Sequence, residues 1–293
     1  SDAVRAKVLL VADEMGYRRN ESASVLRRRD LKIAVCLPSA EQEGSFYFAY
    51  LWRGVKRYEA ESRDHGMVFD ARPFVIGGYA KVLEEVISQA EAGERPDGMI
   101  AYAPVEPGTV ELLTKISKLG VSVVLVDGDR PHTGRLGATV AGYSEAGSLM
   151  AEQAANLLPG VPGAKKILLL AGDPHTDSHA DVARAFHAYF DERGLDYAVR
   201  DLYGAHKQIE ELRQKVGALL SDPDAPGLVC SVFAVGSEVV ADAVMELGLV
   251  GKIRVIASDL FPENVIAMRR GIFTNIVYKD PIALAYRGAK MLG

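Results

Sequence analysis

The feature that most constrains this chain is a repeated alternation of short apolar runs and amphipathic stretches, which begins at Leu31. Turn residues bound each apolar run, and the stretch that follows has apolar residues at helical spacing. The apolar runs cover residues 31–38, 66–72, 97–104, 121–127, 165–172, 197–203, 227–234 and 253–259. The helical stretches cover residues 48–62, 82–92, 110–119, 145–158, 180–193, 207–220 and 237–247. Strands that are apolar throughout and alternate with helices predict parallel sheets covered on both faces, so the expected fold class is α/β.

The number of units leaves two architectures open. Eight strand and helix units would either close into one barrel or divide into two open sheets. Residues 156–165 read NLLPGVPGAK, and their prolines and glycines are typical of a connection between lobes. We therefore expect two Rossmann-like lobes, each built on a parallel sheet.

Composition narrows the classes of function. The chain has 293 residues, 48% of them hydrophobic and 25% charged, as expected for a chain that folds around cores. Its net charge of −5 gives no overall attraction to nucleic acid, so DNA binding would need a local basic segment. Cys36 and Cys230 lie inside apolar runs, which favours buried thiols in a reducing, cytoplasmic compartment. No apolar segment is long enough to span a membrane and the first residues lack a secretory pattern, so we expect neither membrane insertion nor export.

A basic segment lies near the N-terminus. Residues 3–15 have the spacing of an amphipathic helix, and residues 17–29 contain five arginines and one acidic residue, a local charge of +4. One interpretation of this segment is a solvated linker. The other is a DNA-contacting segment, in which a short helix over residues 21–28 inserts an apolar side chain between base steps while arginines neutralise phosphates.

The run VRAKVLLVADEMGYRRNESASVLRRRDLKIAV resembles the lac-repressor/gal-repressor (LacI/GalR) family at the end of its DNA-binding headpiece. The resemblance implies that residues 4–15 are the last headpiece helix, that residues 20–28 are the hinge helix, and that most of the helix-turn-helix is missing from the sequence. Arg19 stands where proline is usual in the family, and Ser24 where arginine is usual. The DNA contacts that the resemblance implies are Asn20, Ala23, Leu26, Arg27 and Arg28, with Leu26 entering the minor groove.

The resemblance extends over nearly the whole chain, through FYFAYLWRGV, RPDGMIAYAP, EAGSLMAEQAANLL and VIASDLFPENVIAMRRGIF. It implies a type I periplasmic-binding-protein-like fold, in which two Rossmann-like lobes close on a small ligand. Residues 1–30 would be the remnant of the headpiece with the hinge helix, and 31–158 the N-terminal lobe. Residues 159–271 would be the C-terminal lobe, and 272–293 a return to the N-terminal lobe.

The family resemblance predicts a ligand-responsive transcriptional regulator. Such a protein would be a cytoplasmic homodimer that represses transcription from operator DNA and senses a sugar, a polyol or a sugar derivative in the cleft between its lobes. The alternative is an exported solute-binding protein of a sugar ABC transporter, and the basic segment argues against it. No phosphate-binding loop, nucleophile elbow or GxGxxG pattern stands in the required context, so we expect no enzymatic activity, no catalytic residue and no cofactor.

Ligands of open α/β sheets bind beyond the carboxyl ends of the strands, so the residues that follow the apolar runs are candidate ligand contacts. Phe46 and Tyr47 follow the first run and would present aromatic faces to the cleft. Arg72 closes the second run and would donate hydrogen bonds to a hydroxyl or carboxylate of the ligand. Asp177 follows the run 165–172, where it would cap the next helix or touch the ligand.

The family implies the remaining candidates. Asp259 ends the run VIASD and matches an aspartate that binds sugar hydroxyls. Tyr203 matches an aromatic residue that stacks on a sugar ring, and Lys279 stands where a glutamine is common. An Asn-Asp pair of the family falls on Gly236-Ser237 in one alignment, which makes Ser237 a candidate, and on Phe233-Ala234 in another. Because this pair is replaced, an ordinary hexose site is not expected, and the ligand would be a sugar derivative, a polyol, a small acid or a less polar compound.

One loop has the spacing of a metal site. His175, Asp177 and His179 alternate along the chain, as three metal ligands on a strand would. Gly172 and Pro174 instead predict a loop at this point, so we expect no metal site.

Overall fold

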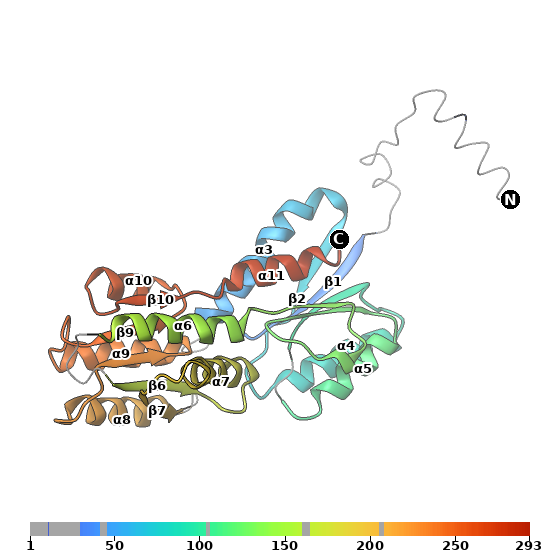
Figure 1. The fold of residues 1–293 in the computed structure, drawn as a ribbon. Coiled ribbons are helices and arrows are strands. Elements are labelled where there is room, and N and C mark those ends of the chain that lie inside the picture. The colour runs from blue at the N-terminus through green and yellow to red at the C-terminus, as the bar shows by residue number, and fades with distance from the viewer. Residues whose placement is uncertain (1–10, 12–29, 42–45, 104–105, 160–164, 205–207) are drawn as a thin grey trace.

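The computed structural model describes residues 11, 30–41, 46–103, 106–159, 165–204 and 208–293. In these ranges the chain forms two parallel five-stranded sheets, one in each lobe (Figure 1). The first sheet has the order β2-β1-β3-β4-β5, with β1 Leu31–Cys36, β2 Met67–Ala71, β3 Gly98–Tyr102, β4 Ser122–Val126 and β5 Gly137–Thr139. The second has the order β10-β9-β8-β6-β7, with β6 Lys166–Gly172, β7 Ala198–Tyr203, β8 Leu228–Ser231, β9 Arg254–Ser258 and β10 Asn275–Val277. The predicted α/β class with two parallel-sheet lobes is confirmed, and a barrel is excluded.

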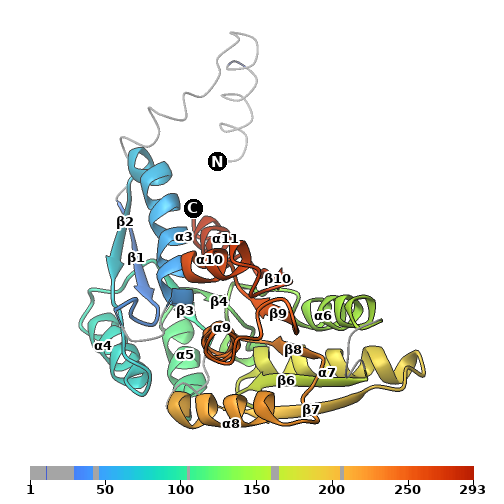
Figure 2. The ribbon, with the colours of Figure 1, turned by 90° about the vertical axis from the view of Figure 1, so that its left-hand side faces the viewer.

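Helices cover both faces of each sheet. They are α3 Phe46–Ser62, α4 Tyr79–Glu91, α5 Thr109–Lys118, α6 Tyr143–Leu157, α7 Asp177–Glu192, α8 Ile209–Ser221, α9 Ala234–Glu246, α10 Pro262–Arg269 and α11 Pro281–Lys290. In the first lobe, α4 and α5 lie on one face of the sheet, while α3 and α11 lie together on the other (Figure 2). Successive strand side chains point to opposite faces. Accordingly, Ala34 and Cys36 of β1 pack toward α4 and α5, and Ile33 and Val35 pack toward α3 and α11.

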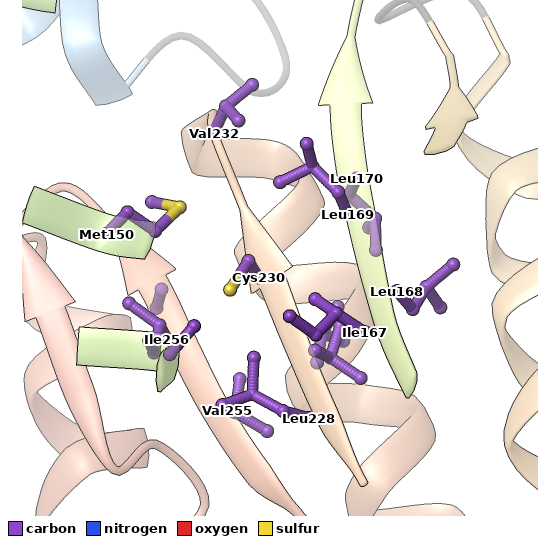
Figure 3. Close-up of a cluster of buried hydrophobic side chains, with 14 of the residues drawn as sticks. Met150, Ile167, Leu168, Leu169, Leu170, Leu228, Cys230, Val232, Val255 and Ile256 are labelled. Atoms are coloured by element: carbon purple, nitrogen blue, oxygen red, sulfur yellow. The ribbon is translucent and has the colours of Figure 1, made fainter. Parts of the chain in front are cut away.

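The second lobe has one continuous core. Figure 3 shows Met150 of α6 beside the strands that carry Cys230 and Ile256. Both cysteines are buried thiols, as the sequence predicts. Burial raises the pKa of the Cys36 thiol to about 12, so it stays protonated at neutral pH.

The crossings between the lobes fall at different residues from those predicted. Helix α6 packs on α7 and on the second sheet, because its apolar face fills that core. The first crossing is therefore at residues 140–142, between β5 and α6, and not at 156–165. Strand β10 pairs with β9 in the second sheet, so the return to the first lobe begins after Val277 and not at residue 272. The boundaries at 158 and 271 are corrected accordingly.

Candidate functional site

A cavity of about 380 Å³ lies between the lobes, beyond the carboxyl ends of β1, β3, β4, β6, β8 and β9. This is where the ligand of an open α/β sheet is expected. Its wall combines aromatic rings with carboxylates. The lining residues are Pro38, Tyr47, Phe48, Phe74, Ile76, Tyr79, Tyr102, Glu106, Asp127, Tyr143, Asp173, Thr176, Ser178, His179, Gly204, Val232, Phe233, Ala234, Asp259 and Lys279.

Two aspartates occupy equivalent places in the two lobes. Asp127 directly follows β4, and Asp259 directly follows β9. Both have left-handed backbone dihedrals, with φ of 67° and 69°. Each backbone N–H donates a 2.9 Å hydrogen bond to the last residue of the neighbouring edge strand, Thr139 for Asp127 and Val277 for Asp259. Left-handed non-glycine residues are uncommon and are found often at functional sites, which makes the cavity that this pair faces the candidate site.

Tyrosine hydroxyls surround the carboxylate of Asp127. The Tyr47 hydroxyl donates to Asp127 Oδ1 at 2.6 Å, and the Tyr143 hydroxyl donates to the same oxygen. Burial raises the pKa of Asp127, and the hydrogen bonds from Tyr143, Tyr47 and Tyr102 oppose that rise. Because α6 belongs to the second lobe, the bond from Tyr143 also joins the two lobes at this carboxylate.

Asp259 forms an ion pair with Lys279. Lys279 Nζ lies 3.2 Å from Asp259 Oδ1, and the two side chains are only 9% and 3% exposed. Burial raises the pKa of Asp259, and the positive charge of Lys279 opposes the rise. Lys279 also donates to the carbonyl of Val232 at 3.4 Å. Asp259 Oδ1 is itself buried, and the ammonium group of Lys279 is the polar group that lies beside it.

A histidine and a glutamate complete the polar wall. The backbone N–H of Asp173 donates to His179 Nδ1 at 3.1 Å, so this ring nitrogen carries no proton and the ring is neutral. The His179 ring also packs on Phe233, at 5.2 Å between centroids. Glu106 accepts hydrogen bonds from the backbone N–H groups of Gly77 at 2.7 Å and Tyr79 at 3.3 Å, at the start of α4.

The structure brings three predicted ligand contacts, Tyr47, Asp259 and Lys279, into the cavity wall. Phe46 and Asp177 lie beside it without lining it. The Phe46 ring packs on Phe261, at 5.8 Å between centroids. The Asp177 carboxylate forms an ion pair with Arg130 at 2.5 Å, which joins α7 to the loop after β4 in the other lobe.

Three other candidates do not line the cavity, and the predictions for them are corrected. Arg72 donates to Asp70 Oδ2 at 2.8 and 2.6 Å and to Gln89 at 2.6 Å, which holds it against α4. Tyr203 is 51% exposed and donates to Asp201, on the edge strand β7. Ser237 is fully buried inside α9, where its hydroxyl accepts from the Ser258 backbone N–H at 2.9 Å.

Of the two alignments of the Asn-Asp pair, the one that falls on Phe233-Ala234 reaches the cavity, since both residues line it. Sequence reasoning missed Asp127, Tyr102, Glu106 and Tyr143. The signal for Asp127 was present, because it ends an apolar run just as Asp259 does. The DNA-contact candidates Asn20, Ala23, Leu26, Arg27 and Arg28 lie outside the described residues.

Metal and membrane sites are absent from the described part of the chain. It contains no group of three or more His, Cys, Asp or Glu side chains placed to hold a metal ion. No helix within those same residues has the length and apolar character needed to cross a membrane.

Fold and cavity together define a two-lobed α/β protein with a site of ligand size between the lobes. Residues 33–293 match the family model described as "Periplasmic binding protein domain", and the chain belongs to this family. No curated protein matches the chain in sequence.

Solved structures with the same fold come from proteins of two kinds. GanP, a glucose-galactose binding protein from Geobacillus stearothermophilus, is similar at a TM-score of 0.74 and 17% identity over 90% of each chain. A protein assigned as a LacI transcriptional regulator from Bacteroides fragilis has a TM-score of 0.75 and 15% identity, again over 90% of each chain. An ABC transporter solute-binding protein from Burkholderia graminis C4D1M, in complex with D-arabinose, has a TM-score of 0.73 and 17% identity over 90% of this chain and 88% of that one.

Proposed function

We propose that this protein binds a small polyhydroxylated molecule, a sugar, a polyol or a sugar derivative, between its lobes. The observation that carries the proposal is the pair Asp127 and Asp259, which face one cavity from equivalent strand ends. Buried carboxylates accept strong hydrogen bonds from hydroxyl groups. Aromatic residues such as Tyr47 and Phe233 offer faces for the C–H side of a ring.

We further propose that ligand binding regulates transcription and involves no turnover of the ligand. The basic residues 17–29 and their resemblance to a hinge helix support contacts from Asn20, Ala23, Leu26, Arg27 and Arg28 to operator DNA. A palindromic operator would be read by a cytoplasmic homodimer. The likeness to the Bacteroides fragilis protein is compatible with this role.

Ligand binding is tested by a thermal-shift screen of sugars, polyols, sugar phosphates and small acids, followed by calorimetry. A ligand that binds only the folded state raises stability by RT ln(1 + [L]/Kd), so the midpoint of unfolding rises as the concentration of a binder is increased. We expect at least one polyhydroxylated compound to do so. The absence of any shift across the panel contradicts the proposal.

DNA binding is tested by gel shift on a mixed-sequence duplex at low and at physiological salt. Replacing both Arg27 and Arg28 by Ala should weaken binding and reduce the salt slope by up to about 1 for each phosphate that is no longer neutralised. Arg184→Ala is the matched control, because Arg184 is an exposed arginine on α7 that pairs with Asp181. Equal binding by both variants would mean that residues 17–29 are a linker.

The second candidate function is that of an exported solute-binding protein for sugar transport. The specific support is that the Geobacillus and Burkholderia structures are described as a glucose-galactose binding protein and as a transporter component with D-arabinose. The two candidates share the ligand site and differ in DNA binding. The gel shift therefore separates them.

A further inference from the structure

The charge of the cavity wall distinguishes among polyhydroxylated ligands. Among the described lining residues are four carboxylates, Glu106, Asp127, Asp173 and Asp259, and one ammonium group, Lys279. His179 adds no charge, because its Nδ1 accepts a hydrogen bond from a backbone N–H. The described wall therefore carries an excess of negative charge.

The four carboxylates differ in how they are compensated. Asp259 has the ammonium group of Lys279 at 3.2 Å. Glu106 accepts from two backbone N–H groups at the start of α4, where the helix dipole also favours a negative charge. Asp173 lies in the loop after β6 and accepts from the backbone N–H of His175 at 2.9 Å. Asp127 receives hydrogen bonds from the hydroxyl groups of Tyr47 and Tyr143. The positive charge of Lys279 also acts on it, but the ion pair that Lys279 forms is with Asp259.

The surroundings of Asp127 also suit a cation. Tyr47, Tyr102 and Tyr143 all line the cavity, and the hydroxyl groups of Tyr47 and Tyr143 donate hydrogen bonds to this carboxylate. Phe48 packs edge-on against Tyr102, at 5.8 Å between centroids, and lines the same wall. Aromatic rings attract cations through their negative faces, most strongly where water is excluded. An ammonium group bound at this buried carboxylate would gain from the charge of Asp127 and would lie among aromatic side chains.

We propose that the ligand is a polyhydroxylated compound that carries a protonated amine, such as an amino sugar, with the ammonium group paired to Asp127 and hydroxyl groups bound near Asp259. This proposal rests on the proposed ligand-binding function and specifies its ligand class. The same wall disfavours sugar phosphates and sugar acids, because their anionic groups would enter a cavity of like charge.

The test is calorimetry of the wild-type chain with matched sets of D-glucose, D-galactose and D-mannose, their 2-amino and N-acetylamino derivatives, and glucose 6-phosphate. At least one amino sugar should bind about tenfold or more tightly than its neutral parent, since a charged hydrogen bond replaces a neutral one. The N-acetylated form keeps the nitrogen without its charge, so it should not show the gain. If every neutral parent binds at least as tightly as its amine, the amine proposal fails and the sugar-binding function stands. If no compound in the wider panel binds, both fail.

A pair of variants assigns the preference to one carboxylate. Asp127→Asn keeps the shape and removes the charge, so the preference for amine over parent sugar should fall to within about twofold. Asp196→Asn is the control, because it removes the same charge from an exposed carboxylate paired with Lys165 at 2.7 Å in the second lobe. An undiminished amine preference in Asp127→Asn overturns the assignment. The wild-type comparison decides the ligand class independently of whether that variant folds.

Discussion

At the scale of single residues, the cavity is built where the backbone is least relaxed. Asp127 and Asp259 have left-handed dihedrals that cost a non-glycine residue energy, and Asp280, in the second connection between the lobes, is a third such residue. Each cavity aspartate is held by a backbone hydrogen bond to an edge strand and by polar partners on its carboxylate. The surrounding fold therefore fixes these carboxylates in position before any ligand arrives.

A glycine at the end of β6 should be sensitive to substitution. Gly172 ends β6 with φ of 72°, and a Cβ there would lie 2.6 Å from Nδ1 of His179. Gly172→Ala should lower the free energy of unfolding by about 2–4 kcal/mol, from left-handed strain plus displacement of the ring. Gly194→Ala is the control, because Gly194 has φ of 60° and no atom lies within 4 Å of its added Cβ. This substitution should lower the free energy of unfolding by only about 1–2 kcal/mol. Urea denaturation measures both, and equal effects would show that the His179 contact carries no weight.

A histidine outside the cavity should make stability depend on pH. His187 Nε2 lies 2.9 Å from Asp201, and this hydrogen bond raises the pKa of His187. A raised folded-state pKa gives stability that is complete below the unfolded value of about 6.5 and is lost as the pH rises through the folded value. The difference in unfolding free energy between wild type and Asp201→Asn should therefore shrink from about pH 6 to about pH 9. Because His187 is 38% exposed, this difference should be at most about 1 kcal/mol.

The control for this titration is Asp196→Asn, whose partner Lys165 stays protonated over that range. Its effect on stability should be constant with pH. A constant effect of Asp201→Asn as well would show that His187 does not titrate against that carboxylate.

Single residues were the least predictable part of the site. Asp259 could be placed at the cavity because it directly follows a strand, Lys279 because it stands at a crossing between the lobes, and Tyr47 because it begins the helix that follows the first strand. The orientation of Arg72 could not, since it depends on Gln89, a partner 17 residues away on a helix. Tyr143 could not either, because its role follows from a crossing that the sequence placed after α6.

At the scale of elements, long periodic segments were predictable and short ones were not. The central strands and the helices from α3 to α9 have enough apolar residues to show their period. Strands β5 and β10 have three residues each and take their conformation from the neighbouring strand. Helix α10 has eight residues, few of them buried, so its amphipathic pattern is weak. The edge strands β5 and β10 complete the sheets and accept the backbone hydrogen bonds of Asp127 and Asp259, although the sequence pattern does not reveal these strands.

Helices α3 and α11 approach so closely at Gly54 that the packing leaves no room for a side chain there. Gly54 of α3 faces α11, and a Cβ there would lie 2.3 Å from the carbonyl oxygen of Ile282. Gly54→Ala should therefore push the helices apart and cost about 1–3 kcal/mol. Gly217→Ala, in α8, is the matched control, because nothing lies within 4 Å of its added Cβ. It should stabilise the protein by about 0.5–1 kcal/mol through the helix preference of alanine. Thermal and urea unfolding should give opposite signs for the two variants, and the same sign would contradict this packing.

At the scale of the whole molecule, the two lobes repeat one plan and touch at a few points besides the connections. The sheets have equivalent strand orders, with the cavity aspartates after the fourth strand of each lobe in chain order. Phe261 of the second lobe is buried against Tyr50 of α3, at 5.1 Å between ring centroids. Arg130 of the first lobe pairs with Asp177 of the second. If the ligand binds only when the lobes are held together by these contacts, a substitution that removes one of the contacts weakens ligand binding.

The ion pair between Arg130 and Asp177 gives the last prediction. Since it joins the lobes and lines no part of the cavity, Arg130→Gln should shift the population toward separated lobes without altering ligand contacts. An exposed pair contributes about 0.2–1 kcal/mol, so the affinity for the tightest ligand of the screen should fall by at most about 5-fold. Small-angle scattering of the ligand-free variant should show a larger radius of gyration than wild type. Arg184→Gln is the control, because its partner Asp181 is on the same helix and joins no lobes. If both variants bind and scatter like wild type, the ion pair does not hold the lobes together.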